Sequence, residues 1–171
     1  MALTLPAPTE YNEFYAGYIA QAPKENLSGH LQEQLHQTAA LVRGLSEEQA
    51  LHRYAEDKWS VKELLGHMAD TERIMSYRLL RIARGDTTPL PGFDQDLFNR
   101  GASFDDWSVG QLADELTLVR QATLSLIAGL RPDDWLREGS LSGFPITARA
   151  LAHIIAGHEL HHLRILQERY I

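Results

Sequence analysis

The sequence predicts an all-α protein, an up-and-down type four-helix bundle with a long crossover between its second and third helices. Three observations support this prediction. Four stretches repeat apolar residues at helical spacing, each is bounded by capping or turn residues, and no stretch shows a convincing strand alternation. Because 171 residues and 19.3 kDa correspond to about one domain, we expect residues 1–171 to form a single bundle.

The four helices are expected at residues 24–44, 60–84, 108–130 and from about 147 almost to the C-terminus. Two of them begin at a serine capping box. Ser60 with Glu63 starts the second helix, and Ser108 with Gln111 starts the third. Gly44 ends the first helix. These boundaries are therefore predicted from local chemistry as well as from periodicity.

Three segments connect or precede these helices. The long connection after the second helix contains several prolines and glycines, and a short helical turn is expected there at residues 94–99. Residues 131–146 are expected to be an irregular connection. Residues 1–23 are expected to pack as an arm through four aromatic rings, those of Tyr11, Phe14, Tyr15 and Tyr18. A homodimer would bury the same rings, so both alternatives stay open.

Composition excludes several classes of function. The chain has no cysteine, so disulfides and thiolate metal sites are excluded, and a tight metal site must use histidine nitrogen and carboxylate oxygen. A net charge of -7 with scattered basic residues predicts no nucleic-acid partner. The sequence has no basic start followed by an apolar run and nothing near the roughly 18 apolar residues of a membrane span. We therefore expect a cytoplasmic protein that does not bind membranes.

Histidines are the first indication of chemistry, since four of the eight lie between residues 153 and 162. His158 and His162 are four positions apart on a helix, about 40° around its axis, and they fall on its apolar stripe. Two buried imidazoles cost desolvation energy unless their nitrogens find partners, and one metal ion supplies both. Hydrogen bonds to neighbouring groups are the competing explanation. His161 lies about 60° from His158, so periodicity alone does not choose between His161 and His162.

A third ligand must come from another helix, and His67 in the middle of the second helix is the candidate. Alone, a histidine there is more often an ordinary half-buried side chain. Its position on the flank of the apolar stripe lets it face the fourth helix across the bundle. His153 points about 140° away from His158, so we expect it to be exposed or paired elsewhere.

Residues 158–162 also match the H-E-x-x-H motif of zinc proteases, in which the glutamate is the general base. Those proteases need a third ligand, usually downstream, and a strand to bind peptide. Only nine residues follow His162, and no strand is predicted. We therefore expect Glu159 to be a solvated residue or a partner of Arg149 or Arg164.

Four sequence segments together resemble the DinB-like proteins, including the bacillithiol transferase, or YfiT-like, branch. They are KWSVKELLGHMADTER (58–73), RIARGD (81–86), PGFDQD (91–96) and AGHELHHL (156–163). The resemblance covers about residues 10–171. It implies a four-helix bundle with one divalent metal ion, zinc or nickel, on His67, His158 and His162, and by analogy it favours His162 over His161.

Three neutral imidazoles leave a coordination position open, as catalytic sites do. The resemblance further implies a thiol-dependent S-transferase, with a low-molecular-weight thiol and an electrophilic small molecule as partners. One alternative is metal-assisted hydrolysis, in which Asp70 or Glu159 handles the proton. Another is a bundle without catalytic activity. We also expect Asp70 to contact a ligand histidine, because a second bond fixes the imidazole tautomer.

Overall fold

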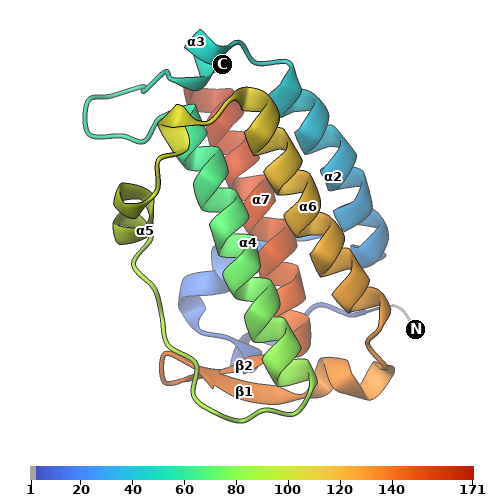
Figure 1. Ribbon diagram of the computed structural model, residues 1–171. Coiled ribbons are helices and arrows are strands. Elements are labelled where there is room, and N and C mark those ends of the chain that lie inside the picture. Colours follow the sequence, from blue (N-terminus) through green and yellow to red (C-terminus); the bar gives the residue numbers. More distant parts are fainter. Residues whose placement is uncertain (1–2) are drawn as a thin grey trace.

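Four long helices form the bundle in the computed structural model, which describes residues 3–171 (Figure 1). They are α2 (Leu27–Arg43), α4 (Val61–Ala83), α6 (Val109–Ala128) and α7 (Ala148–Arg169). All four coincide with the predicted helices. Both predicted serine capping boxes are present. The side chains of Ser60 and Ser108 each accept a hydrogen bond from the backbone N–H three residues on, and the side chain of that residue accepts one from the serine's backbone N–H.

The crossover between α4 and α6 decides how the chain runs through the bundle. It returns the chain to the end at which α4 began, so α4 and α6 run in the same direction, while α2 and α7 run the opposite way (Figure 1). Glu47 marks the shared end, because it pairs with Lys62 at 2.7 Å and accepts a bond from the Val109 amide at 2.9 Å. The predicted four-helix bundle with a long crossover is confirmed, and its second and third long helices are parallel neighbours.

Shorter elements lie in the connections. The helix α3 (Glu47–Ala50) precedes α4, and α5 (Gln95–Gly101) lies in the crossover, where Asp94 caps it as the predicted helical turn requires. Single 3-10 turns occupy Pro8–Glu10, Glu13–Tyr15, Phe104–Asp106 and Pro132–Leu136. Among residues 3–171, no helix is both long and apolar enough to span a membrane.

The expectation of an irregular connection at residues 131–146 is wrong, because that segment contains a β-hairpin. Strands β1 (Glu138–Leu141) and β2 (Phe144–Thr147) pair antiparallel. Ser142 and Gly143 both have positive φ, 52° and 84°, as a two-residue hairpin turn requires. Four-residue strands are too short for alternation to be visible in the sequence. The hairpin binds the crossover, since Leu90 donates to the Ser140 carbonyl at 2.8 Å and accepts from Ser142 at 2.9 Å.

The N-terminal segment packs as an arm within the chain. Its helix α1 (Ala16–Gln21) lies against α7, so the predicted arm is present from residue 3 onward, and residues 1–2 lie outside the described part. Glu10 accepts bonds from Thr147 and Arg149 at 2.8 and 2.7 Å. Of the four aromatic rings, only Phe14 is largely exposed, at 73%. The arm thus accounts for most of this aromatic surface, and the homodimer stays a prediction.

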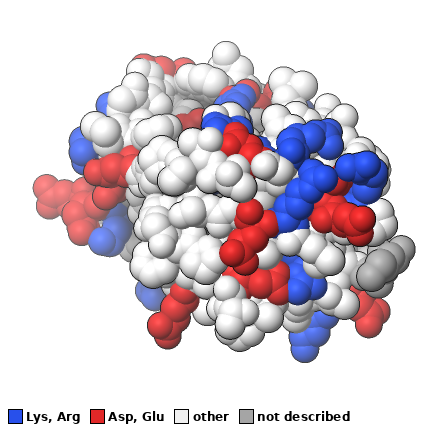
Figure 2. Space-filling model, turned by 90° about the horizontal axis from the view of Figure 1, so that it is seen from below, with Lys and Arg blue, Asp and Glu red and all other residues white. Residues whose placement is uncertain are grey.

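The apolar core consists of two clusters, one at each end of the bundle. One cluster contains Leu31, Leu79 and Ile154, and the other contains Val61 and Leu166. A layer of buried polar side chains separates them. Seen from the hairpin end, the surface is uncharged over much of its area, with acidic and basic side chains interspersed around it (Figure 2).

Gly157 allows the arm to approach α7, and this makes a testable prediction. A Cβ atom at this position would lie 1.9 Å from the Tyr18 carbonyl oxygen, which is backbone and cannot rotate away. We expect Gly157→Ala to lower the free energy of unfolding by about 1–3 kcal/mol. In Gly17→Ala, where the space is open, we expect no loss or a gain of up to about 1 kcal/mol. Urea denaturation of both variants measures this, and equal stability would contradict the close approach.

Candidate metal centre

Three histidines from two helices converge at the middle of the bundle. The Nε2 atom of His158 lies 3.2 Å from Nε2 of His67 and 3.0 Å from Nε2 of His162. All three side chains are buried, at 5%, 7% and 8% exposure for His67, His158 and His162. The potential ligand atoms lie within 4.8 Å of one another, a group that could hold a metal ion. The convergence predicted from the sequence is therefore confirmed.

The spacing of the nitrogen atoms suits an ion. Ligands at about 2.0–2.1 Å from a tetrahedral centre lie about 3.3 Å apart, close to the observed separations. Hydrogen bonds alone satisfy the rings poorly. The Nε2 atom of His158 offers a single lone pair, so it cannot accept a good hydrogen bond from Nε2 of both His67 and His162. The buried Nδ1 of His162 has no partner among residues 3–171, with or without an ion. The donor set therefore fits a divalent ion that accepts all three Nε2 lone pairs.

Neighbouring side chains fix the rings from outside. The Nδ1 atom of His67 lies 3.4 Å from Thr71 Oγ1, one helical turn further along α4. The expected contact from Asp70 is not formed, since its carboxylate lies beside Arg73 at 3.7 Å. Position 70 is rotated about 60° from position 67, whereas position 71 is rotated by only about 40° in the other direction. The rings of Trp59 and Tyr18 pack against His67 and His158, with centroids 4.9 and 5.3 Å apart.

The structure also resolves the histidines outside the cluster. His161 points away from the converging nitrogens and packs against the Tyr18 ring at 5.3 Å, so the geometry brings His162 into the group instead. His153 is fully buried, with Nδ1 2.8 Å from the Arg149 carbonyl oxygen. Its expected pairing elsewhere is present, whereas exposure is not.

Glu159 differs from the expectation that it is solvated or bound to Arg149 or Arg164. It is buried, and accepts bonds from Arg120 at 2.7 Å and from Thr38 at 2.5 Å. Arg149 binds Glu10 instead. Glu159 is thus directed toward α2 and α6 and fixed there, unlike the free general base of the protease motif.

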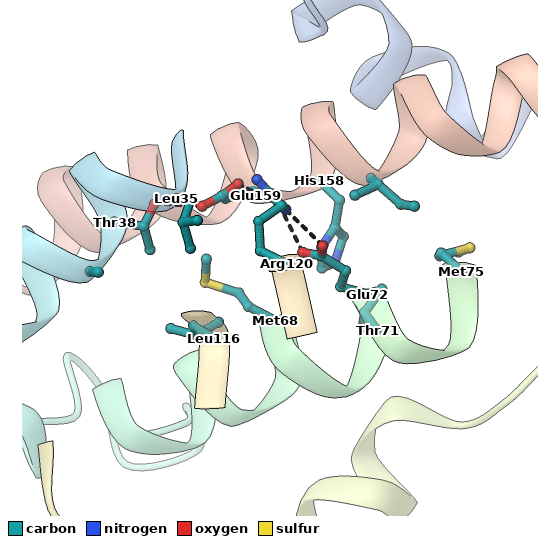
Figure 3. A pocket seen from close by; sticks show the side chains of 12 residues that line it. Leu35, Thr38, Met68, Thr71, Glu72, Met75, Leu116, Arg120, His158 and Glu159 are labelled. Atoms are coloured by element: carbon teal, nitrogen blue, oxygen red, sulfur yellow. Dashed lines mark hydrogen bonds and ion pairs between the residues drawn. The ribbon is translucent and has the colours of Figure 1, made fainter. Parts of the chain in front are cut away.

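Arg120 lies at the centre of this buried polar group, as Figure 3 shows. It is 3% exposed, and donates to both carboxylate oxygens of Glu72 at 2.7 and 2.8 Å in addition to Glu159. Burial by itself would lower the pKa of Arg120, but the two carboxylates raise it overall. Sequence reasoning missed this group. A signal existed, because Arg120 falls on the apolar stripe of its helix, four residues after Leu116 and three before Thr123.

His158 lies between two cavities. The inner cavity, of about 20 Å³, is lined by His158, Thr71 and the Arg120 group, among others, and has room for about one water molecule (Figure 3). The outer cavity, of about 290 Å³, is lined by His67 and His158 with residues of the arm, the crossover and the hairpin. Small-molecule sites start at about 300 Å³, so only the outer cavity suits a substrate. Its described lining contains no Asp or Glu.

Burial keeps the three imidazoles neutral. It lowers the pKa of His67 to about 4. Burial, together with nearby His67 and His161, lowers the pKa of His162 to about 3. Burial and the neighbouring histidines lower the pKa of His158 well below its usual value. At neutral pH the rings are therefore in the form that binds a metal ion.

The fold and the buried histidine group define a helical bundle suited to a metal ion, and comparison with known proteins agrees. The family model of the DinB superfamily matches residues 30–166, and the chain belongs to this superfamily. The match does not distinguish the bacillithiol transferase branch.

Among solved structures, the chain is similar to YfiT from Bacillus subtilis, described as a probable metal-dependent hydrolase with an unusual four-helix bundle topology. The TM-score is 0.71 with 16% sequence identity, over 95% of this chain and 89% of that one. At this identity the likeness establishes the fold. No curated protein matches the sequence significantly.

The first prediction from this centre concerns Arg120. Replacing it in Arg120→Met leaves the buried carboxylate of Glu159 and the largely buried one of Glu72, 11% exposed, without their cation, so we expect the free energy of unfolding to fall by about 3–5 kcal/mol. Arg73→Met is the matched control, because Arg73 joins the same two helices through Glu115 but is 48% exposed. Its loss should be under about 1 kcal/mol. Urea denaturation separates the two, and equal losses would show that Arg120 does not organise the interior.

The second prediction concerns pH. With chelator present, the protein should lose stability as pH falls from about 6.5 to about 4. In that window unfolded histidines, with pKa near 6.5, bind protons that folded His67 and His162 exclude. Each histidine lowers the free energy of unfolding by about 1.4 kcal/mol per pH unit. Chemical denaturation across this range measures the slope, and His162→Gln should make it shallower. An unchanged slope in that variant would argue against the buried neutral ring.

Proposed function

We propose that this protein is a metal-dependent enzyme that uses one divalent ion, zinc or nickel, on His67, His158 and His162. The observation that supports this most strongly is the convergence of three buried neutral imidazoles beside a cavity of small-molecule size. An ion with three neutral ligands keeps its full charge and would stabilise the ionised form of a thiol or a water molecule in that cavity. Catalytic sites share this open arrangement.

We further propose that the reaction is S-transfer from a low-molecular-weight thiol to an electrophilic small molecule. In this reaction the thiol loses its proton to solvent. Its sulfur then forms a bond to an electrophilic carbon, and the leaving group departs with the bonding electron pair. The protein's own residues have two tasks: Thr71 orients His67, and Trp59 and Tyr18 cover the rings of His67 and His158 on the outside.

The positions of the carboxylates favour S-transfer over hydrolysis. Hydrolysis profits from a positioned base that takes the proton of water, and Asp70 and Glu159 were the sequence-based candidates. Glu159 is bonded to Arg120 on the inner side, and Asp70 lies beside Arg73. Neither lines the outer cavity. A thiol ionises more readily than water and needs no such base. Hydrolysis is the second candidate, because the similar structure of YfiT is described as a probable metal-dependent hydrolase.

The test compares His162→Ala with His161→Ala, its neighbour outside the cluster. Zinc and nickel content and turnover of a small electrophile are measured with and without added thiol. We expect His162→Ala to lose the metal and at least about 100-fold in turnover while keeping its helical circular dichroism, because two apolar clusters support the fold without the ion. His161→Ala should keep both metal and turnover.

Three outcomes would contradict the proposal. Equal turnover without thiol would favour the hydrolase. Failure of the chelator-treated wild-type protein to take up zinc or nickel would favour a bundle without catalytic metal. Loss of most helical circular dichroism on chelation would show that the ion maintains the fold, since its binding energy would then be folding energy.

A further inference from the structure

The outer cavity contains a buried arginine that has no anionic partner within residues 3–171. Arg78 of α4 is 4% exposed and lines this cavity together with His67 and His158. Its Nη2 donates to the Pro91 carbonyl at 2.6 Å, and its Nη1 lies 3.5 Å from the Met75 sulfur. Within residues 3–171, no carboxylate oxygen lies within 4.0 Å of its guanidinium. The other buried arginine, Arg120, has two carboxylates.

This arrangement is costly without a ligand. A guanidinium stays charged in proteins and carries five N–H donors, of which the oxygen and sulfur contacts occupy two. Buried charges are normally paired, because moving a charged group out of water costs far more free energy than a hydrogen bond to a neutral group recovers. Phe93 covers one side of the guanidinium, with its ring centre 5.6 Å from Cζ. An anion in the cavity is the missing partner that this environment would accept.

The position of Arg78 relative to the histidines suits one ligand that reaches both. Arg78 follows His67 by eleven residues on the same helix, which places it about 20° around the axis and roughly 16 Å along it. Helical side chains lean toward the N-terminus, so Arg78 leans toward His67. Tyr15 and Tyr18 of the arm line the same cavity.

We propose that Arg78 binds an anionic oxygen group, a carboxylate or a phosphate, of the small molecule whose reactive end lies at His67, His158 and His162. This inference rests on the proposed function, because it takes the three histidines as the reactive end. The guanidinium can bind such a group through two parallel N–H donors, and this pairing adds direction as well as energy. The ligand is then an extended acid, with several bonds between its reactive atom and its anionic group.

A structural role for Arg78 predicts something different. Its bond to the Pro91 carbonyl fastens the crossover to α4, so removing it will affect stability in either case. Stability therefore cannot decide between the two roles. The ratio of affinities for an anionic ligand and its neutral counterpart can decide between them, because a purely structural role for Arg78 leaves that ratio unchanged.

The experiment uses the cobalt(II)-loaded protein, whose visible absorption changes when a thiol binds at the metal. Two matched pairs serve as probes: glutathione with its diethyl ester, and 4′-phosphopantetheine with pantetheine. The first pair tests a carboxylate and the second a phosphate. We expect the anionic member of one pair to bind roughly 10- to 100-fold more tightly. Arg78→Gln should abolish this preference, and Arg78→Lys should keep part of it. The control Arg84→Gln, which changes an exposed arginine directly after α4, should keep all of it.

Equal affinities within both pairs, or a preference that persists in Arg78→Gln, would overturn the inference. A second arm separates it from the proposed function. Succinate and inorganic phosphate are titrated into metal-free wild-type and Arg78→Gln protein by calorimetry. If thiols leave the cobalt spectrum unchanged but one anion binds through Arg78, the thiol function fails and the anion site stands. If neither anion binds and no thiol pair shows a preference, the anion site fails.

Discussion

A layer of buried polar side chains across the middle of the bundle constrains the rest of the structure. Thr38, Arg120 and Glu159 form one part of it together with Glu72 at its edge, whose side chain is 11% exposed, and the three histidines form the other. Polar groups at this depth cost free energy unless each finds a partner. The four long helices must therefore meet in one register, in which Arg120 reaches two carboxylates and the imidazoles of α4 and α7 converge.

The two parts of this layer are coupled through neighbouring positions on α7. His158 and Glu159 point about 100° apart, so one helix presents an imidazole to α4 and a carboxylate to Arg120. The group of Glu72, Arg120 and Glu159 carries a formal charge of about -1 when all three are ionised. If a divalent cation binds the histidines, this excess negative charge would favour it in a medium of low dielectric constant. The glutamate of the H-E-x-x-H pattern thus helps to fix the register of α7 against α2 and α6.

The full set of His67, His158 and His162 was implied by the resemblance to the DinB-like proteins. Sequence periodicity and capping residues predicted the four helices, the serine caps of α4 and α6 and the long crossover, because these features follow from local spacing. It could not choose between His161 and His162, since the rotation of α7 depends on packing. The hairpin was missed because its strands are only four residues long. The predicted partner of Glu159 was wrong for another reason. Its actual partner, Arg120, lies 39 positions away in the sequence, and only the fold brings the two together.

The same architecture places the histidines on helices and most of the outer cavity's other lining residues on segments outside the four long helices. The histidines lie on two long, packed helices, which hold ligand atoms more precisely than loops do. The outer cavity is completed by segments outside the four helices: Tyr15 and Tyr18 from the arm, Phe93 from the crossover and Ser142 from the hairpin. Because the crossover makes α4 and α6 parallel, it must travel back along the bundle, and it passes the histidines on the way. Connecting segments change more readily than packed helices. A bundle of this kind can therefore retain its three converging histidines while the connections determine which molecule reaches them.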